Sequence, residues 1–184
     1  MTVTLSMLWL PILLSAVFVF IASNILWMAL PFWHGRDYGR MSSDSAIQDA
    51  LTNVGSGQYI VPWVDWKTQT PEERAERQKK PFAFMYVRNP GTFAFPKAIA
   101  VYFIYTLIVA FFVGYVASCT IAAGTHYLQV FRVVGAVGFI AFAFRGFPDS
   151  IWYGKPWKVT FKEVIDGLIY GCLMAGTFGW LWPK

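Results

Sequence analysis

Two histidines are the first residues to consider for chemistry in this sequence, because an imidazole can bind a haem iron, a chlorophyll magnesium or a metal ion. His34 follows the first long apolar stretch, and His126 precedes the third. In a chain that crosses a membrane, these positions lie on opposite sides of an apolar layer about 30 Å thick, so the two imidazoles cannot hold one haem together. Each histidine is a candidate for a single axial ligand, and a structural role at the membrane interface is the simpler interpretation of both.

Two charged residues inside apolar stretches are the next candidates, since a charge within a membrane is costly unless it is paired or reaches the interface. Arg132 lies near the start of the third stretch, where we expect it to reach lipid phosphate; an anionic ligand or a salt bridge to a partner subunit is the alternative. Asp166 lies near the start of the fourth stretch. We expect it to pair with Lys162, Arg145 or Lys158, and without such a partner it would be a candidate for proton relay.

Other chemical motifs are missing from the sequence. Cys119 and Cys172 lack the spacing of a metal site, and we expect them to be free thiols that pack as small apolar residues. There is no phosphate-binding loop, dinucleotide fingerprint, nucleophile elbow or H-E-x-x-H sequence. The apolar stretches hold no pair of carboxylates and the two halves no repeat, which weighs against a proton-driven carrier. The sequence predicts no catalytic residue, metal or cofactor, and leaves contact with a lipid, quinone or pigment open.

Four apolar stretches must position these residues. The chain is 57% hydrophobic and only 14% charged, with a mean hydropathy of +0.47, whereas soluble domains are about a quarter charged. The stretches cover residues 5–32, 95–119, 127–147 and 163–182, and about 20 apolar residues suffice for a helix to cross a bilayer. We therefore predict an all-α membrane protein, with four transmembrane helices in one membrane domain of residues 1–184. The first stretch is too long for a cleaved signal, so we expect it to remain as the first span.

The fourth stretch has a face of small residues that recur every four positions. They are Gly167, Gly171, Ala175 and Gly179. Small side chains along one face let the backbone of another helix approach closely, so we expect this face to pack against a helix. Aromatic and basic residues precede the stretch, and Trp180 and Trp182 lie at its end, as is typical of the two water interfaces of a transmembrane helix.

The main extramembrane part of the chain is a polar loop, residues 33–92. Serines and an aspartate at positions 42–44 predict the start of a short capped helix with an apolar face. Thr70, Pro71 and Glu73 have the pattern of a capping box at the start of a highly charged surface helix. Residues 82–87 are expected to form a short strand or an interfacial segment. The loop therefore adds short helices to the membrane domain.

The distribution of positive charge predicts the orientation in the membrane. Of the 15 lysines and arginines, all but Arg132 and Lys184 lie on or beside the loop and the link between the third and fourth stretches. Positive residues collect on the cytoplasmic side, so we expect the loop in the cytoplasm and both termini on the outer side of a bacterial inner membrane. The same placement explains the net charge of +5 without a nucleic-acid partner.

Several segments resemble a family of small bacterial integral membrane proteins that has four helices and no assigned activity. The segments are LPFWHGRDYGRM at 30–41, SAIQDAL at 45–51, GQY at 57–59, FRVVG at 131–135, IWYGKPWK at 151–158, DGLIYG at 166–171 and AGTFGWLWP at 175–183. The resemblance covers most of the chain. It implies the four-helix topology and a bacterial origin, and it implies no activity.

Three functions are compatible with these features. The first is a non-catalytic accessory subunit of a larger bacterial membrane complex, most plausibly one of respiratory or photosynthetic electron transfer, with lipids and other transmembrane subunits as partners. The second is a small membrane enzyme or carrier for a lipid or quinone, which requires a cavity between the protein's own helices that reaches Arg132 or Asp166. The third is a subunit with one haem or chlorophyll held by His34 or His126.

Overall fold

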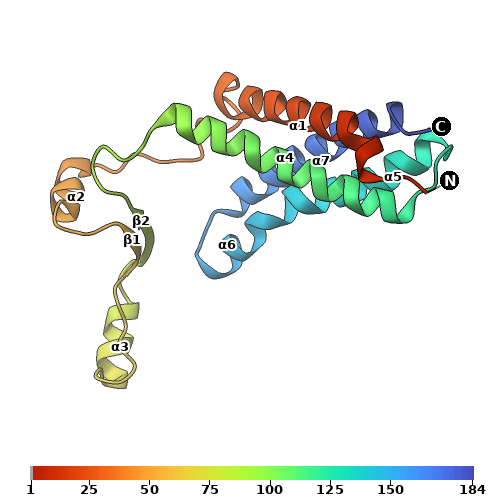
Figure 1. The fold of residues 1–184 in the computed structure, drawn as a ribbon. Coiled ribbons are helices and arrows are strands. Elements are labelled where there is room, and N and C mark those ends of the chain that lie inside the picture. Colours follow the sequence, from red (N-terminus) through yellow and green to blue (C-terminus); the bar gives the residue numbers. More distant parts are fainter. Residues whose placement is uncertain (1) are drawn as a thin grey trace. The chain divides into compact units, whose positions relative to one another are not determined.

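The computed structural model describes residues 2–184, which are mostly helical and include one small two-stranded sheet. They divide into two compact units. One unit consists of the chain up to Gly39 together with Phe95–Lys184, and the other consists of Arg40–Ala94. The predicted loop began at residue 33, but residues 33–39 belong to the helical unit. Figure 1 shows the helices of the first unit and the short elements of the second.

The first unit is a bundle of four long helices, α1, α4, α5 and α7 (Figure 1). A 3-10 turn, η1 (Leu5–Leu8), leads into α1 (Trp9–Asn24), which ends in a π-helical turn, η2 (Ile25–Ala29). Helix α4 covers Phe95–Thr120 and α5 covers Tyr127–Ala143. A 3-10 turn, η3 (Phe144–Gly146), and the short helix α6 (Phe147–Trp152) continue α5, and α7 covers Trp157–Trp180.

Among the described residues, three helices are long and apolar enough to cross a membrane, not the four that were predicted. They are Leu5–Ala29, Phe95–Thr120 and Tyr127–Trp152. The fourth predicted span is also a long helix, but α7 begins at Trp157 and carries Lys158, Lys162, Glu163 and Asp166 in its first turns. These charges make α7 less apolar than the other three, and most of them are held in contacts inside the bundle.

Neighbouring helices of the bundle run in opposite directions. Phe20 of α1 contacts Phe103 of α4, with ring centroids 5.3 Å apart, and Ile12 lies beside Gly114, where an added Cβ would be 3.0 Å from the Ile12 side chain. Helix α7 packs against α1 and α5, and its C-terminal end lies beside the turn between α4 and α5, where the Trp182 indole donates a 2.9 Å hydrogen bond to the Ala122 carbonyl. The core is apolar, with Leu8, Val113, Val130, Met174 and Phe178 at most 2% exposed.

The small residues of α7 lie against α5 of the same chain. A Cβ added to Gly167 would be 2.7 Å from the Ala143 backbone nitrogen, and one added to Gly171 would be 2.9 Å from the Phe139 backbone nitrogen. Ala175 is fully buried on the same face, and Gly179 lies against the Tyr127 ring. This face is therefore covered within the bundle and offers no surface to a helix of another subunit.

The second unit contains four short elements. They are α2 (Asp44–Leu51), β1 (Gly57–Val61), α3 (Pro71–Gln78) and β2 (Ala83–Val87). The two strands are antiparallel, with Tyr59 opposite Met85. The predicted capping box is confirmed, because the Thr70 hydroxyl accepts a hydrogen bond from the Glu73 N–H and the Glu73 carboxylate accepts one from the Thr70 N–H. The serine that precedes α2 makes no such bond.

Candidate functional site

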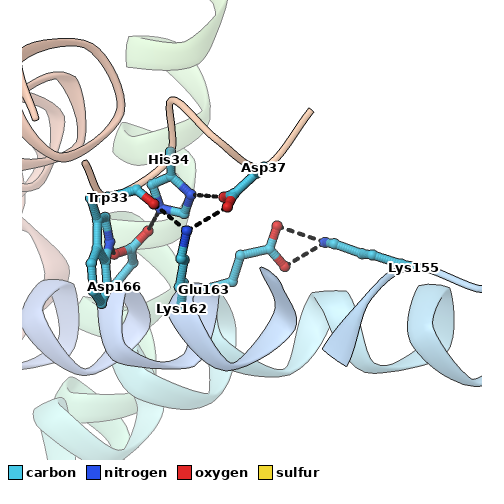
Figure 2. A network of polar contacts seen from close by, with 7 residues as sticks. All are labelled: Trp33, His34, Asp37, Lys155, Lys162, Glu163 and Asp166. Atoms are coloured by element: carbon cyan, nitrogen blue, oxygen red, sulfur yellow. Dashed lines mark hydrogen bonds and ion pairs between the residues drawn. The ribbon is translucent and has the colours of Figure 1, made fainter. Parts of the chain in front are cut away.

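A tight turn after α1 holds three polar side chains against α7. The Trp33 N–H donates to the Leu30 carbonyl and the Asp37 N–H donates to the His34 carbonyl, each at 3.0 Å. A Cβ at Gly35 would collide with the carbonyl oxygen of Pro31, so glycine lets the turn close this tightly. Closure of the turn brings Trp33, His34 and Asp37 to the same face of α7 (Figure 2).

Helix α7 supplies the other half of the site. Lys162 and Asp166 are four residues apart and therefore share one face of the helix, and both reach the turn after α1 (Figure 2). Glu163 faces a different neighbour, and both its carboxylate oxygens accept from the Lys155 ammonium at 2.6 Å.

His34 lies between two carboxylates. Its Nδ1 is 2.5 Å from Oδ2 of Asp37, and its Nε2 is 2.8 Å from Oδ2 of Asp166 (Figure 2). The Trp33 indole N–H donates to the other oxygen of Asp166 at 2.8 Å, and the Lys162 ammonium donates to the other oxygen of Asp37 at 2.5 Å and to the Trp33 carbonyl. We call these five residues the His34 network. The imidazole and both carboxylates are 2–5% exposed, so the network is shielded from water.

The geometry of the His34 network fixes how many protons it holds. A neutral imidazole donates from one ring nitrogen and accepts at the other, whereas an ionised carboxylate only accepts. Both ring nitrogens face carboxylate oxygens. Two hydrogen bonds therefore require either a doubly protonated imidazole or a protonated carboxyl group. Either alternative places two protons on the line of three groups from Asp37 through His34 to Asp166, one more than a neutral imidazole between two ionised carboxylates would carry.

Asp37 is the ionised end of this line. Burial by itself disfavours the charge, but hydrogen bonds from Lys162 and His34, together with their positive charge, outweigh it and lower the pKa of Asp37 below its ordinary value. The Lys162 ammonium, 12% exposed, is the strongest of these partners. The Asp37–Lys162 ion pair thus joins the turn after α1 to α7 by charge as well as by hydrogen bonds.

Two cavities adjoin the His34 network. The smaller, about 20 Å³, is lined by Asp166, Glu163, Arg145, Tyr170, Tyr102, Trp27 and Phe142. The larger, about 350 Å³, is lined by Ser23, Asn24, Trp27, Met28, Ile99, Tyr102 and Arg145. Trp27 connects the cavities to the network, because its ring stacks on the His34 imidazole with centroids 3.8 Å apart. The π-helical turn η2 carries Trp27, and such turns in α-helices are frequent at functional sites.

Asp166 has partners, but not the predicted ones. It binds His34 and Trp33, whereas Lys162 binds Asp37. Arg145 lines the same small cavity as Asp166 without forming an ion pair with it. Spacing along one helix favoured Lys162, but the turn after α1 supplies two donors that approach Asp166 from outside the helix.

The two histidines lie at opposite ends of the bundle. His126 is the N-cap residue of α5, and its Nδ1 accepts a hydrogen bond from the Leu128 N–H at 3.3 Å. The structure does not bring His126 near His34. Because both ring nitrogens of His34 bond to carboxylates, an axial bond from His34 to a haem or chlorophyll would break one of these contacts.

The remaining predicted residues lie on the surface of the bundle. Arg132 is exposed on α5, with no hydrogen bond or ion pair to the part of the chain that the structure describes. Cys119 and Cys172 are free thiols, as predicted, but both are exposed rather than packed inside. Cys119 lies on α4, which is apolar enough to cross a membrane, and an outward-facing position on a membrane helix suits a small apolar side chain.

Sequence reasoning missed Trp33 and Asp37, and it treated His34 and Asp166 as separate candidates. A signal was present, because His34–Asp37 is an i,i+3 pair of polar residues beside a span, and Lys162–Asp166 is an i,i+4 pair near the start of another helix. Nothing in the sequence shows that these two pairs, separated by more than 120 residues, lie side by side.

Comparisons with protein-family models, with curated proteins and with solved structures find no match for this chain. Within residues 2–184, no group of three or more histidine, cysteine, aspartate or glutamate side chains could hold a metal ion. The chemistry of the site therefore has to be inferred from its geometry.

Proposed function

We propose that this chain is an accessory subunit of a larger bacterial membrane complex, bound to its partner through the unit Arg40–Ala94. In this proposal α7 crosses the membrane with the three apolar helices, and the second unit lies in the cytoplasm. The packing of α7 against α1 and α5 supports its crossing of the membrane. The lysines and arginines of the loop support the cytoplasmic location of the second unit.

The main support for the proposal is that no residue of the second unit is buried. A two-stranded sheet is at best marginally stable alone, because it has no opposing layer to cover it. Here the uncovered side chains are large and aromatic: Trp63 is 67% exposed, Trp66 72% and Tyr86 74%. Large exposed aromatic side chains of this kind are enriched at protein interfaces.

The charge of the second unit favours a protein over a lipid surface as the partner. Surfaces that bind anionic lipid carry an excess of basic residues. The basic residues of this unit are Arg40, Lys67, Arg74, Arg77, Lys79, Lys80 and Arg88. The acidic residues are Asp44, Asp49, Asp65, Glu72, Glu73 and Glu76. The positive and negative charges of the unit nearly cancel. A partner would therefore contact exposed aromatic side chains and charges of both signs, which are common at protein interfaces.

The partner would identify the process. From the sequence we expect a respiratory or photosynthetic electron-transfer complex, and this is the first assembly to test. The glycine face of α7 plays no part in this docking, because α5 already covers it.

A photo-crosslinking residue at Trp66 or Tyr86, expressed in native membranes, tests the proposal. We expect a crosslink to a fixed partner protein and a large band on a native gel. The same residue at Ala46 in α2, which is exposed and does not line the groove beside Tyr86, is the control and should crosslink less. A chain that runs alone, with crosslinks only to lipid or to itself, would contradict the accessory role.

The second candidate function is a small membrane enzyme or carrier for a lipid or quinone. The observation in its favour is the cavity of about 350 Å³, which shares Trp27, Tyr102 and Arg145 with the small cavity that reaches Asp166. Turnover or transport of a lipid or quinone by the purified chain, lost in Asp166→Asn, would favour this function over the accessory role.

A further inference from the structure

The larger cavity opens where α1 passes into its π-helical turn and α4 begins. Its walls are of two kinds. Trp27, Met28 and Ile99 form an apolar side, and the remaining lining is polar and includes the Arg145 guanidinium. A volume of about 350 Å³ is within the range of small-molecule sites, which run from about 300 to 1,000 Å³.

Arg145 is the charge in this region that has no counter-ion. Among the described residues it makes no hydrogen bond or ion pair. Glu163 is bound by Lys155, and Asp37 and Asp166 belong to the His34 network. Asp149, four residues after Arg145, forms no ion pair with it. A guanidinium that lines a cavity without a carboxylate partner is suited to a planar or tetrahedral anion, which it can bind through two parallel hydrogen bonds.

A second, independent feature is the Tyr170 hydroxyl. Tyr170 is 4% exposed and lines the small cavity, and its hydroxyl has no hydrogen-bond partner in the described chain; the Trp27 indole lies near it without completing a bond. A buried hydroxyl without a partner costs free energy. The small cavity has room for about one water molecule, enough to connect this hydroxyl to a group bound at Arg145.

Ser23 and Asn24 complete the polar wall. The Ser23 hydroxyl and the Asn24 amide N–H both donate to the Phe20 carbonyl, at 2.8 and 2.7 Å. The Ser23 hydroxyl and one of the two Asn24 amide N–H groups are used within the helix, and Arg145 is the residue of this wall that carries a positive charge for an anion.

We propose that this cavity binds the anionic head group of a membrane amphiphile. The phosphate or carboxylate of the head group binds the Arg145 guanidinium, with a water-mediated hydrogen bond from Tyr170. The first carbons of the chain lie against Trp27, Met28 and Ile99. The inference holds whether the chain is an accessory subunit with a bound lipid or a carrier with its substrate.

The test uses the full-length chain purified in a neutral detergent, with native mass spectrometry to measure binding. The probes are phosphatidylglycerol and oleate as the two anionic amphiphiles, phosphatidylcholine as the lipid without net charge, and inorganic phosphate as the anion without a chain. We expect both anionic amphiphiles to bind and the other two to bind at least tenfold more weakly. The ratio of phosphatidylglycerol to oleate affinity identifies the preferred head group.

Three variants locate the site. Arg145→Gln should weaken binding of the anionic amphiphiles about tenfold or more, because it removes a charge-assisted hydrogen-bonding group. Tyr170→Phe should weaken it severalfold, and Ile99→Trp, which fills the apolar side and leaves Arg145 in place, should also weaken it. Arg36→Gln is the matched control, since Arg36 is an exposed arginine outside both cavities.

Each contrary result has a definite meaning. Equal losses in Arg145→Gln and Arg36→Gln would show general attraction between basic protein and acidic lipid, and would overturn the site. Tight binding of inorganic phosphate would reduce it to a small-anion site and overturn the amphiphile. Binding of phosphatidylcholine at full strength, or of a neutral quinone with no effect of Arg145→Gln, would overturn the anionic head group. If Arg145→Gln does not fold, Ile99→Trp and Tyr170→Phe decide the outcome.

Discussion

At the scale of single residues, the central feature is one imidazole shared by two buried carboxylates. Asp37 and Asp166 come from different helical elements, and His34 joins them. Buried charges are costly unless every member has a partner, and removing one member leaves the others unpaired. The His34 network satisfies this condition through Lys162 and Trp33. Its members should therefore be far more sensitive to substitution than charged residues on the surface.

The first prediction concerns Asp166. Asp166→Asn keeps the shape of the side chain but removes the charge that holds His34 and Trp33, so the variant should lose about 3–5 kcal/mol of stability, the usual cost of breaking a buried pair. Thermal unfolding in detergent measures the loss. Asp44→Asn removes a carboxylate from an ion pair on an exposed surface and should change the melting temperature little. Equal effects of the two substitutions would contradict the role given to the network.

The second prediction concerns pH. The pKa of Asp37 in the folded protein lies below its ordinary value of 3.8, so its ion pair contributes stability above pH 3.8, and this contribution is lost as the pH falls further, through the lowered pKa. Wild type should therefore be more stable than Asp37→Asn near pH 7. The difference in melting temperature should shrink as the pH is lowered below 3.8. A difference that stays constant on acidification would show that charge at Asp37 is not what stabilises the pair.

At the scale of elements, the contact between α5 and α7 depends on the absence of side chains. Gly167 and Gly171 let the two backbones approach closely, and their neighbours across the interface are backbone atoms that cannot move aside. This close contact also sets the position of Lys162 and Asp166, which lie on the preceding turns of α7. Packing along one face of the helix therefore supports the polar network at its end.

The third prediction tests this contact with two substitutions of the same kind. An added Cβ at Gly167 would be 2.7–2.8 Å from Ala143, whereas at Gly176 the nearest atom, the Tyr127 hydroxyl, is 3.8 Å away. Gly167→Ala should cost about 1–3 kcal/mol through overpacking, and Gly176→Ala should be neutral or slightly stabilising, because alanine favours helix. Unfolding in detergent compares them. If both variants are equally stable, the α5–α7 contact is looser than described.

At the scale of the whole molecule, the number of membrane crossings depends on α7. Three are apolar enough by length and composition, and α7 is a long helix with charges in its first turns. Asp166 and Lys162 bind the turn after α1, and Glu163 binds Lys155. These contacts inside the protein offset much of the free energy that it costs to place the charges in a membrane. Our proposal that α7 crosses the membrane rests on these charge-offsetting contacts and on the packing of α7 among the other helices of the bundle.

The fourth prediction decides between three and four crossings. In a background with both native cysteines replaced, Thr52→Cys and Lys184→Cys place one thiol in the second unit and one at the C-terminus. Four crossings put these thiols on opposite sides of the membrane. Lys184→Cys should then react with a membrane-impermeant maleimide in spheroplasts, and Thr52→Cys only after permeabilisation. Labelling of both thiols under the same condition would show that α7 does not cross.

The sequence determined the parts of this protein that depend on local order. Apolar runs predicted three of the long helices to within a few residues, the four-residue repeat of small side chains identified the face of α7 that meets α5, and the Thr70 capping box located the start of α3. Each of these signals lies within one continuous segment, where spacing alone specifies which side chains share a face.

Only the tertiary structure decided which side chains form hydrogen bonds and ion pairs with each other. The sequence offered Lys162, Arg145 and Lys158 for Asp166, and the fold chose His34 and Trp33, which are more than 130 residues away. It also brought Arg145 to a cavity where no described residue is its counter-ion, and left the Tyr170 hydroxyl without a hydrogen-bond partner among the described residues. The physical reason is that a hydrogen bond or ion pair depends on distances of a few ångströms between atoms. Those distances are set by how α1, α4, α5 and α7 pack, and not by the order of residues along the chain.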